Sequence, residues 1–148
     1  MNIIAVIDTS VWVSALLNPA GYPAQLIQAG KAGDFTIVSS LPLLHELQEV
    51  LLRPRIRKIR QLTDVDIAHF IEAVVEVVRL VPVTGALRLC RDPNDDVILE
   101  TAIVGKATHV VSRDEDMTRD LDLIGTLRQQ GIEVVTVQHF INLSRELT

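Results

Sequence analysis

The chain has 148 residues, 48% of them hydrophobic and 22% charged, which fits one globular domain with a single core and excludes a disordered chain. The net charge of −5 argues against an evenly basic nucleic-acid-binding surface but leaves room for a local basic patch. One cysteine excludes an intramolecular disulfide, and no signal peptide or membrane span is recognisable, so we expect a cytoplasmic protein with no membrane partner.

The first half of the chain predicts an alternation of strands and helices. Residues 3–7 (IIAVI) are a continuous apolar run, typical of a strand that is buried on both faces. Helices are predicted at residues 10–18 and 24–33, where glycine or proline marks each end, and a second strand at residues 35–39. A third helix, at residues 43–52, ends before a proline.

The second half continues the alternation. It predicts a helix at residues 63–80 that begins with a capping box, a strand at 79–83, a helix at 95–107, strands at 108–112 and 131–137, and a helix at 139–148. This order predicts an α/β fold, a three-layer α/β/α sandwich around a five-stranded, mostly parallel sheet. We find no linker and no repeat, so we expect one domain over residues 1–148.

Acidic residues follow two of the predicted strands directly. Asp8 ends the strand at residues 3–7, and Asp114 and Asp116 come just after the strand at 108–112. In open α/β sheets, sites form beyond the carboxyl ends of the strands. We therefore expect these acids to lie at one edge of the sheet.

Two further acids are predicted on inward helix faces. Glu46 lies within the apolar stripe of its helix, three residues after Leu43 and four before Val50, while Glu49 falls on the solvated face. Asp95 is followed at helical spacing by Ile98, Leu99 and Ala102, so it shares their buried face. Asp96 is followed four residues later by Glu100, which predicts a solvated face for both. If the acids form a catalytic site, we expect Asp95→Asn to abolish its activity and Asp96→Asn to leave most of that activity.

The acidic residues Asp8, Glu46, Asp95 and Asp114, with Asp116 nearby, are thus predicted to converge on one pocket. Carboxylates a few ångströms apart repel by about 4 kcal/mol per pair in a protein-like dielectric, so a cation or protonation must relieve them. Oxygen ligands without cysteine or histidine favour Mg²⁺ or Mn²⁺ over Zn²⁺. The chemistry that such a site favours is metal-assisted hydrolysis of a phosphodiester.

Four segments of the chain resemble the successive motifs of the PIN-domain family. They read VIDTSVWVSALL, LLHELQEVL, RDPNDDVILETA and HVVSRDEDM. The similarity covers nearly the whole chain, and it is greatest to the toxin components of bacterial and archaeal toxin–antitoxin systems, akin to VapC toxins. This resemblance implies a PIN-like fold, a Mg²⁺- or Mn²⁺-dependent endoribonuclease, a homodimer and an antitoxin protein as partner.

The resemblance also implies roles for individual residues. Asp8, Glu46, Asp95 and Asp114 would be catalytic metal ligands with Asp116 as an auxiliary, and Ser10 and Ser112 would support them. Two positions depart from the pattern of this branch, since Arg113 stands where glycine is frequent and Ser10 where asparagine is frequent. Both departures bear on electrostatics and substrate fit.

One dense basic run, RPRIRKIR, stands out in this acidic chain. Its cations are candidates for contact with the RNA backbone, the alternative being an ordinary solvated stretch; they are Arg53, Arg55, Arg57, Lys58 and Arg60. The helix at residues 63–80 has a wide apolar face that includes Val74, Val75, Val77 and Val78, which favours a homodimer.

Other functional classes have sequence requirements that can be compared with this chain. A phosphotransfer domain of the haloacid-dehalogenase type requires a second aspartate where Ser10 stands, and no phosphate-binding P-loop motif occurs. A non-catalytic PIN-fold module that binds nucleic acid or protein remains the alternative. Among the remaining polar residues we expect helix caps or surface charges at Asp92, Asp120 and Asp122, and a small buried hydrophobe at Cys90.

Overall fold

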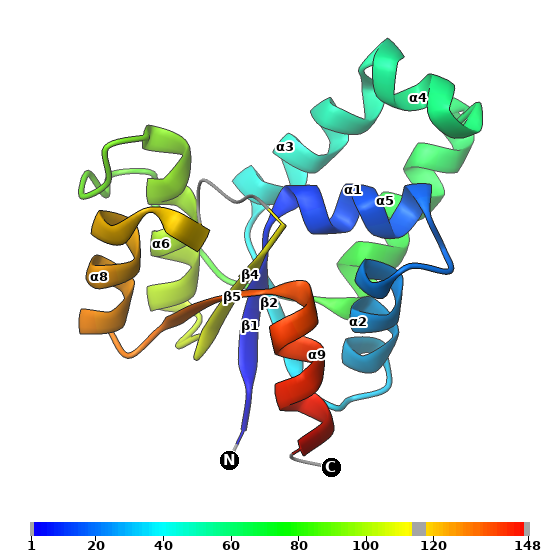
Figure 1. The fold of residues 1–148 in the computed structure, drawn as a ribbon. Helices are drawn as coiled ribbons and strands as arrows, with labels where there is room; N and C mark the ends of the chain where they lie inside the picture. Colours follow the sequence, from blue (N-terminus) through cyan, green and yellow to red (C-terminus); the bar gives the residue numbers. More distant parts are fainter. Residues whose placement is uncertain (1, 114–117, 147–148) are drawn as a thin grey trace.

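The computed structural model describes residues 2–113 and 118–146 and contains one five-stranded sheet (Figure 1). The strands lie in the order β3-β2-β1-β4-β5 and every neighbouring pair is parallel. Their bounds are β1 Ile4–Ile7, β2 Thr36–Ser39, β3 Arg79–Leu80, β4 His109–Ser112 and β5 Glu133–Thr136. Because all the strands run the same way, their carboxyl ends share one edge of the sheet.

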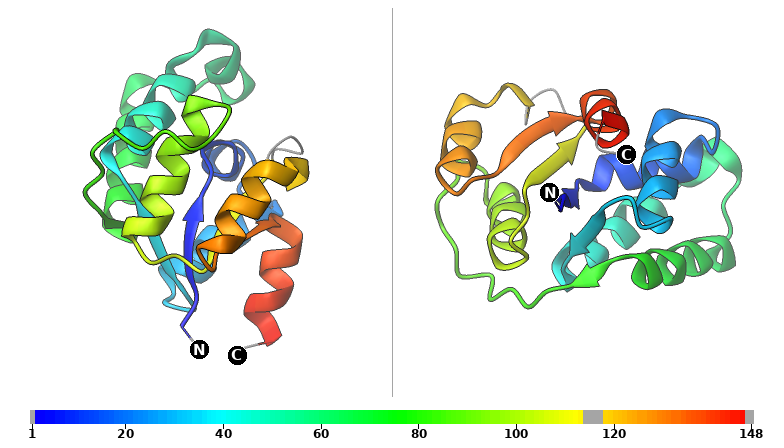
Figure 2. Two further views of the ribbon diagram at one scale, coloured as in Figure 1. Left: turned by 90° about the vertical axis from the view of Figure 1, so that its left-hand side faces the viewer. Right: turned by 90° about the horizontal axis from the view of Figure 1, so that it is seen from below.

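Helices cover both faces of this sheet, so the predicted three-layer α/β/α architecture is confirmed. Viewed from below in Figure 2, α6 and α8 lie on one side of the strands and α2, α5 and α9 on the other. The described helices are α1 Thr9–Leu17, α2 Tyr22–Lys31, α3 Leu41–Leu52, α4 Pro54–Arg60, α5 Asp64–Val77, α6 Pro93–Val104, α8 Leu121–Gln129 and α9 Val137–Glu146.

The position of β1 in the fold explains why its sequence is apolar without interruption. Successive side chains of a strand point to opposite faces, so Ala5 and Ile7 join the core under α1, α2 and α9, while Val6 joins the core under α6 and α8. All three are essentially inaccessible to solvent. A strand with a core on each side needs apolar residues at every position.

Three local expectations were incomplete. The third strand is shorter than predicted, since it ends at Leu80, and Pro82 has no N–H group with which to extend a ladder. The short helix α4 was not anticipated, although Pro54 at its start is a favourable first residue for a helix. The helix α8 was also missed, because only Leu123 and Leu127 of its residues are buried, which is too few to give a clear periodicity.

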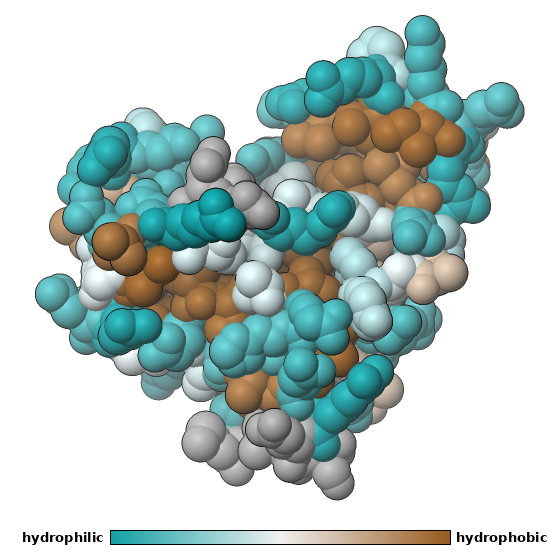
Figure 3. Space-filling view, in the orientation of Figure 1, coloured by the Kyte–Doolittle hydropathy of each residue, from teal (hydrophilic) through white to brown (hydrophobic). Residues whose placement is uncertain are grey.

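The helices α3, α4 and α5 form an arm that extends beyond the sheet (Figure 1). The valines in and just after α5 that had suggested a dimer mostly serve the core of the chain itself. Val74 and Val78 are buried, Val77 packs against the same core, and only Val75 is well exposed. The arm still exposes other apolar side chains, notably Ile59, and Figure 3 shows a hydrophobic area over this part of the molecule. In the described part of the chain, no helix has the length and hydrophobicity to cross a bilayer.

Candidate active site

Asp8 lies where β1 passes into α1. Its N–H group donates to the carbonyl of Val111 at 2.9 Å, so the backbone is still held by β4 at this point. Its carboxylate accepts from Thr9 N–H at 2.9 Å, from Ser10 Oγ at 3.1 Å and from Ser112 Oγ at 3.0 Å. The aspartate is therefore the N-cap of α1 and is oriented by hydroxyl groups from two elements.

Glu46 approaches the same place from α3. The Thr9 hydroxyl donates to Glu46 Oε2 at 3.1 Å, so Thr9 contacts both acids through its backbone and its side chain. Partial burial raises the pKa of Glu46; the bond from Thr9 opposes this rise, and the negative charge of Asp8 adds to it. The structure therefore brings Asp8 and Glu46 together, as their sequence positions had suggested.

Asp95 occupies the first turn of α6 and is half-buried. The helix α6 precedes β4, which runs parallel to β1, so α6 begins at the edge where β1 and β4 end (Figure 1). Its neighbours Ile98, Leu99 and Ala102 are buried against the sheet as expected. A hydrogen bond between Ser40 Oγ and Thr101 Oγ1, 2.9 Å long, also ties the start of α3 to α6.

The prediction of a solvated face for Asp96 and Glu100 was wrong. Asp96 is only 4% exposed and accepts from the N–H groups of Leu89 and Cys90 at 2.9 and 2.7 Å. Glu100 is also buried, and it accepts from the N–H groups of Thr84 and Gly85. These carboxylates bind the backbone of the segment between β3 and α6, here called the 81–92 loop. A variant at Asp96 is consequently not a neutral comparison for Asp95.

The predicted residues Asp114 and Asp116 lie outside the described residues. The structure does fix the end of the strand that leads to them. Ser112 is the last residue of β4, is fully buried and donates to Asp8. The chain therefore leaves β4 at the edge that carries Asp8.

The donor groups at this edge fit a hard divalent cation in their chemistry. Carboxylate oxygens of Asp8 and Glu46 lie among hydroxyl groups, and the charge of Asp8 raises the pKa of Glu46, which is the repulsion that a cation relieves. Over residues 2–113 and 118–146, no three acidic, histidine or cysteine side chains are grouped closely enough to hold a metal by themselves. Within the described residues, Asp8 and Glu46 thus lie together, but Asp95 does not form a group of three with them.

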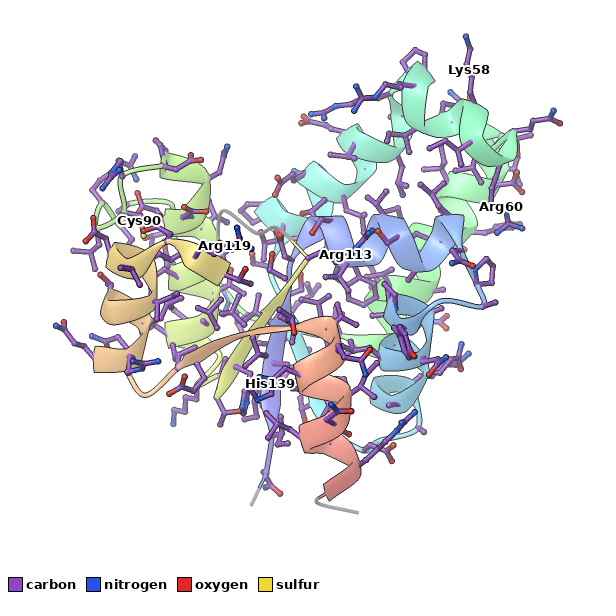
Figure 4. All side chains as sticks on the ribbon, viewed as in Figure 1. Lys58, Arg60, Cys90, Arg113, Arg119 and His139 are labelled. Atoms are coloured by element: carbon purple, nitrogen blue, oxygen red, sulfur yellow. The ribbon has the colours of Figure 1, made fainter. Side chains whose placement is uncertain are left out.

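The basic run is divided between structural and exposed residues. Arg57 forms an ion pair with Asp64 at 2.7 Å, and Arg60 donates to the carbonyl of Leu16. Arg55 and Lys58 are exposed on α4, and Figure 4 shows Lys58 projecting from the end of the arm. Arg53 is also exposed, and its charge acts on Glu46, whose pKa it lowers.

Several smaller expectations are confirmed. Asp92 caps α6 and Asp120 caps α8, while the exposed Asp122 pairs with Arg91 at 2.8 Å. Cys90, which was expected to be buried, is only half-buried; this burial together with Asp96 raises the pKa of the thiol to about 12. Sequence reasoning missed the bridging role of Thr9, although a hydroxyl residue directly after a strand-end aspartate was the available signal.

Comparison with known proteins agrees with this geometry. Residues 5–116 match the PIN domain, so the chain belongs to the PIN-domain family. Proteins of this family are generally nucleases that act on nucleic acid and typically use divalent metal ions. The chain is also 27% identical over 143 residues to the uncharacterised protein MJ1680 of Methanocaldococcus jannaschii, a match that covers 95% of this chain and 91% of the relative.

Proposed function

We propose that the chain is a divalent-metal-dependent endoribonuclease that hydrolyses phosphodiester bonds of RNA. The observation that carries this proposal is the pair of acids Asp8 and Glu46, which are bridged by Thr9 at the carboxyl edge of a PIN-domain sheet. Asp95 lies on a helix that begins at that edge. In this proposal these three acids, with Asp114 and Asp116, bind Mg²⁺ or Mn²⁺.

The roles of the residues follow from their contacts. A bound Mg²⁺ or Mn²⁺ would polarise a phosphate oxygen and lower the pKa of a bound water. Ser10 and Ser112 hold one carboxylate oxygen of Asp8, and Thr9 holds one of Glu46, so each acid is fixed before a ligand arrives. The exposed cations Arg53, Arg55 and Lys58, with Arg57 and Arg60 beside them, supply positive charge for the RNA backbone.

The test is cleavage of a mixed panel of RNA and DNA oligonucleotides with Mg²⁺ or Mn²⁺, with and without EDTA. Glu46→Gln should reduce metal-dependent RNA cleavage at least about a hundredfold, because it removes a ligand charge. Glu49→Gln is the matched control, since this residue lies on the same helix but is exposed. Equal loss in both variants, or cleavage that survives EDTA, would contradict the proposed site. No cleavage by metal-loaded protein would favour the non-catalytic binding module.

We further propose that the nuclease is the toxin of a toxin–antitoxin pair and acts as a homodimer. The four motifs that resemble the toxin branch support the first part. The apolar side chains that the arm leaves exposed, among them Leu52 and Ile59, support the second. Growth arrest on expression of the wild type but not of Glu46→Gln would support a toxin, and a monomer by light scattering at all micromolar concentrations would exclude the dimer.

A further inference from the structure

A small cavity lies between α2 and α9, two helices that Figure 1 shows side by side. Its volume is about 140 Å³, and its lining includes Ala29 of α2, Phe35, and Phe140 and Ser144 of α9. Phe35 directly precedes β2, so the cavity lies toward the amino ends of the strands, whereas Asp8 lies at their carboxyl ends. The cavity is therefore separate from the candidate active site.

The walls of this cavity are apolar and held in place by packing. Phe35 and Phe140 are buried and meet edge to face, with ring centroids 4.7 Å apart and an interplanar angle of 76°. The helix α2 is already in close contact with this layer at Gly30, where an added Cβ would lie 2.5 Å from Ile37 and 3.2 Å from Phe35. Because α2 has no room to move inward, the cavity is preformed and does not close by a shift of the helix.

One buried polar side chain lines the cavity. Ser144 is only 8% exposed, and its hydroxyl group has no hydrogen-bond partner among the residues that the structure describes. Within the same residues, every polar side-chain atom that is sealed from solvent does have a partner, so this hydroxyl must reach open space, and the cavity is that space. The other polar residues of the described lining, Gln25, Asp34 and Arg145, are exposed. The interior therefore offers a ligand one neutral hydrogen-bonding group.

The size and chemistry of the cavity define the class of ligand that fits it. An apolar cavity of roughly 150 Å³ holds one benzene molecule, so this one has room for a single six-membered ring. Buried aromatic and aliphatic walls favour an uncharged ligand, because a charge would lose its hydration there without gaining a partner. The hydroxyl of Ser144 favours a ring that carries a hydrogen-bonding substituent, since an apolar ring alone would leave that hydroxyl covered and unpaired.

We propose that this cavity binds a small uncharged phenol. The ring packs against Phe35 and Phe140, and the hydroxyl group of the ligand forms a hydrogen bond with Ser144. Such a ligand contacts α2 and α9 at once and so stabilises the packing of the last described helix against the fold. The inference is independent of the proposed nuclease function, because none of the described lining residues belongs to the candidate active site.

Phenol itself is the probe, and its binding is followed in ¹H–¹⁵N correlation spectra of the full chain. We expect saturable shifts that are confined to α2, α9 and residues 34–35, with a Kd in the millimolar range because so small a ligand makes few contacts. Amide exchange of α9 should slow as the cavity fills, since the ligand binds the native state alone. Shifts that do not saturate at millimolar phenol, or that spread over the whole surface, would overturn the proposal.

Variants identify the two kinds of contact. Ser144→Ala should weaken the binding of phenol about three- to tenfold, the worth of one hydrogen bond, and should not weaken that of fluorobenzene, a ring without a hydroxyl group. Ala29→Met, which fills the cavity, should abolish the binding of both ligands, whereas Ala32→Met at the exposed end of α2 should abolish neither. An equal effect of Ser144→Ala on both ligands would overturn the hydrogen bond, a comparison that stands even if Ala29→Met does not fold. Unchanged binding in a folded Ala29→Met variant would overturn the site.

Discussion

Thr9 is the residue that joins the two acids of the candidate site. Its N–H group donates to Asp8 and its hydroxyl to Glu46, so the first turn of α1 sets the position of a side chain on α3, 37 residues away. Thr9 is itself buried, which restricts its rotation. Two acids held in this way cannot move apart, so their repulsion has to be relieved by protonation or by a bound cation.

The raised pKa of Glu46 gives a prediction about stability and pH. Burial and the charge of Asp8 make the neutral form the favoured one in the fold, so its stabilising effect is complete below the ordinary pKa of glutamate and is lost as the pH rises through the raised value. In EDTA at neutral pH, Glu46→Gln should therefore be more stable than the wild type, by about 1 kcal/mol or less because solvent screens the half-exposed group.

Urea unfolding at several pH values measures this difference. The advantage of Glu46→Gln should disappear in acid, where the wild-type carboxyl is also neutral. Glu49→Gln, whose side chain is exposed on the same helix, should show no such pH dependence. A glutamine variant that is less stable than the wild type at neutral pH would mean that the acids do not repel.

Asp95 gives a prediction about activity. Asp95→Asn should lower metal-dependent cleavage at least about a hundredfold while the protein stays folded, since it removes a proposed ligand charge but keeps the shape of the side chain. Asp122→Asn should retain nearly all of the activity, because that side chain is 82% exposed and its ion pair with Arg91 is solvated. Single-turnover cleavage rates measure the activity of each variant, and circular dichroism shows whether the variant is folded.

At the scale of elements, α6 shows what a sequence can and cannot predict. The strand β1 and its terminal Asp8 were predictable because an apolar run that ends in an acid is a local signal. The burial of both faces of α6 was not predictable, because the sheet covers the helix on one side and the 81–92 loop covers it on the other. Asp96 and Glu100 find their donors in that loop, 6 to 16 residues earlier in the chain, and no helical periodicity reveals such partners.

The same loop protects the cysteine of the chain. A thiol whose pKa is about 12 is almost entirely protonated at pH 8, and only a thiolate reacts quickly with a disulfide reagent. Cys90 should consequently react with such a reagent far more slowly in the folded protein than in urea. Asp96→Asn should speed the reaction, because it removes the charge that disfavours the thiolate; an unchanged rate in this variant would show that burial alone protects the thiol.

At the scale of the whole molecule, opposite charges lie at the sheet edge and on α4. Asp8 and Glu46 lie where β1 and β4 end, whereas α4 carries the exposed cations Arg55 and Lys58. An RNA strand is attracted by the cations of α4 and repelled by uncompensated acids. Binding of RNA and binding of metal should therefore support each other, and both should weaken as the salt concentration rises.

The metal should also stabilise the fold as a whole. A ligand that binds only the native state adds RT ln(1 + [L]/Kd), about 2.7 kcal/mol at a hundredfold excess over Kd. For a chain of this size that corresponds to a rise of about 5–10 °C in Tm. Millimolar Mn²⁺ should raise the Tm of the wild type by this amount and that of Asp8→Asn by much less, with NaCl at equal ionic strength as the control. An unchanged wild-type Tm would argue against a preformed cation site.

The two carboxylates that hold the 81–92 loop have a consequence for amide exchange with deuterated solvent. Loops without regular structure usually exchange quickly, because nothing retains their N–H groups. Here the amides of Thr84, Gly85, Leu89 and Cys90 are bonded to carboxylates buried on α6. Their deuterium uptake should follow the slow uptake of that helix. A segment without regular secondary structure would then exchange only when α6 itself unfolds.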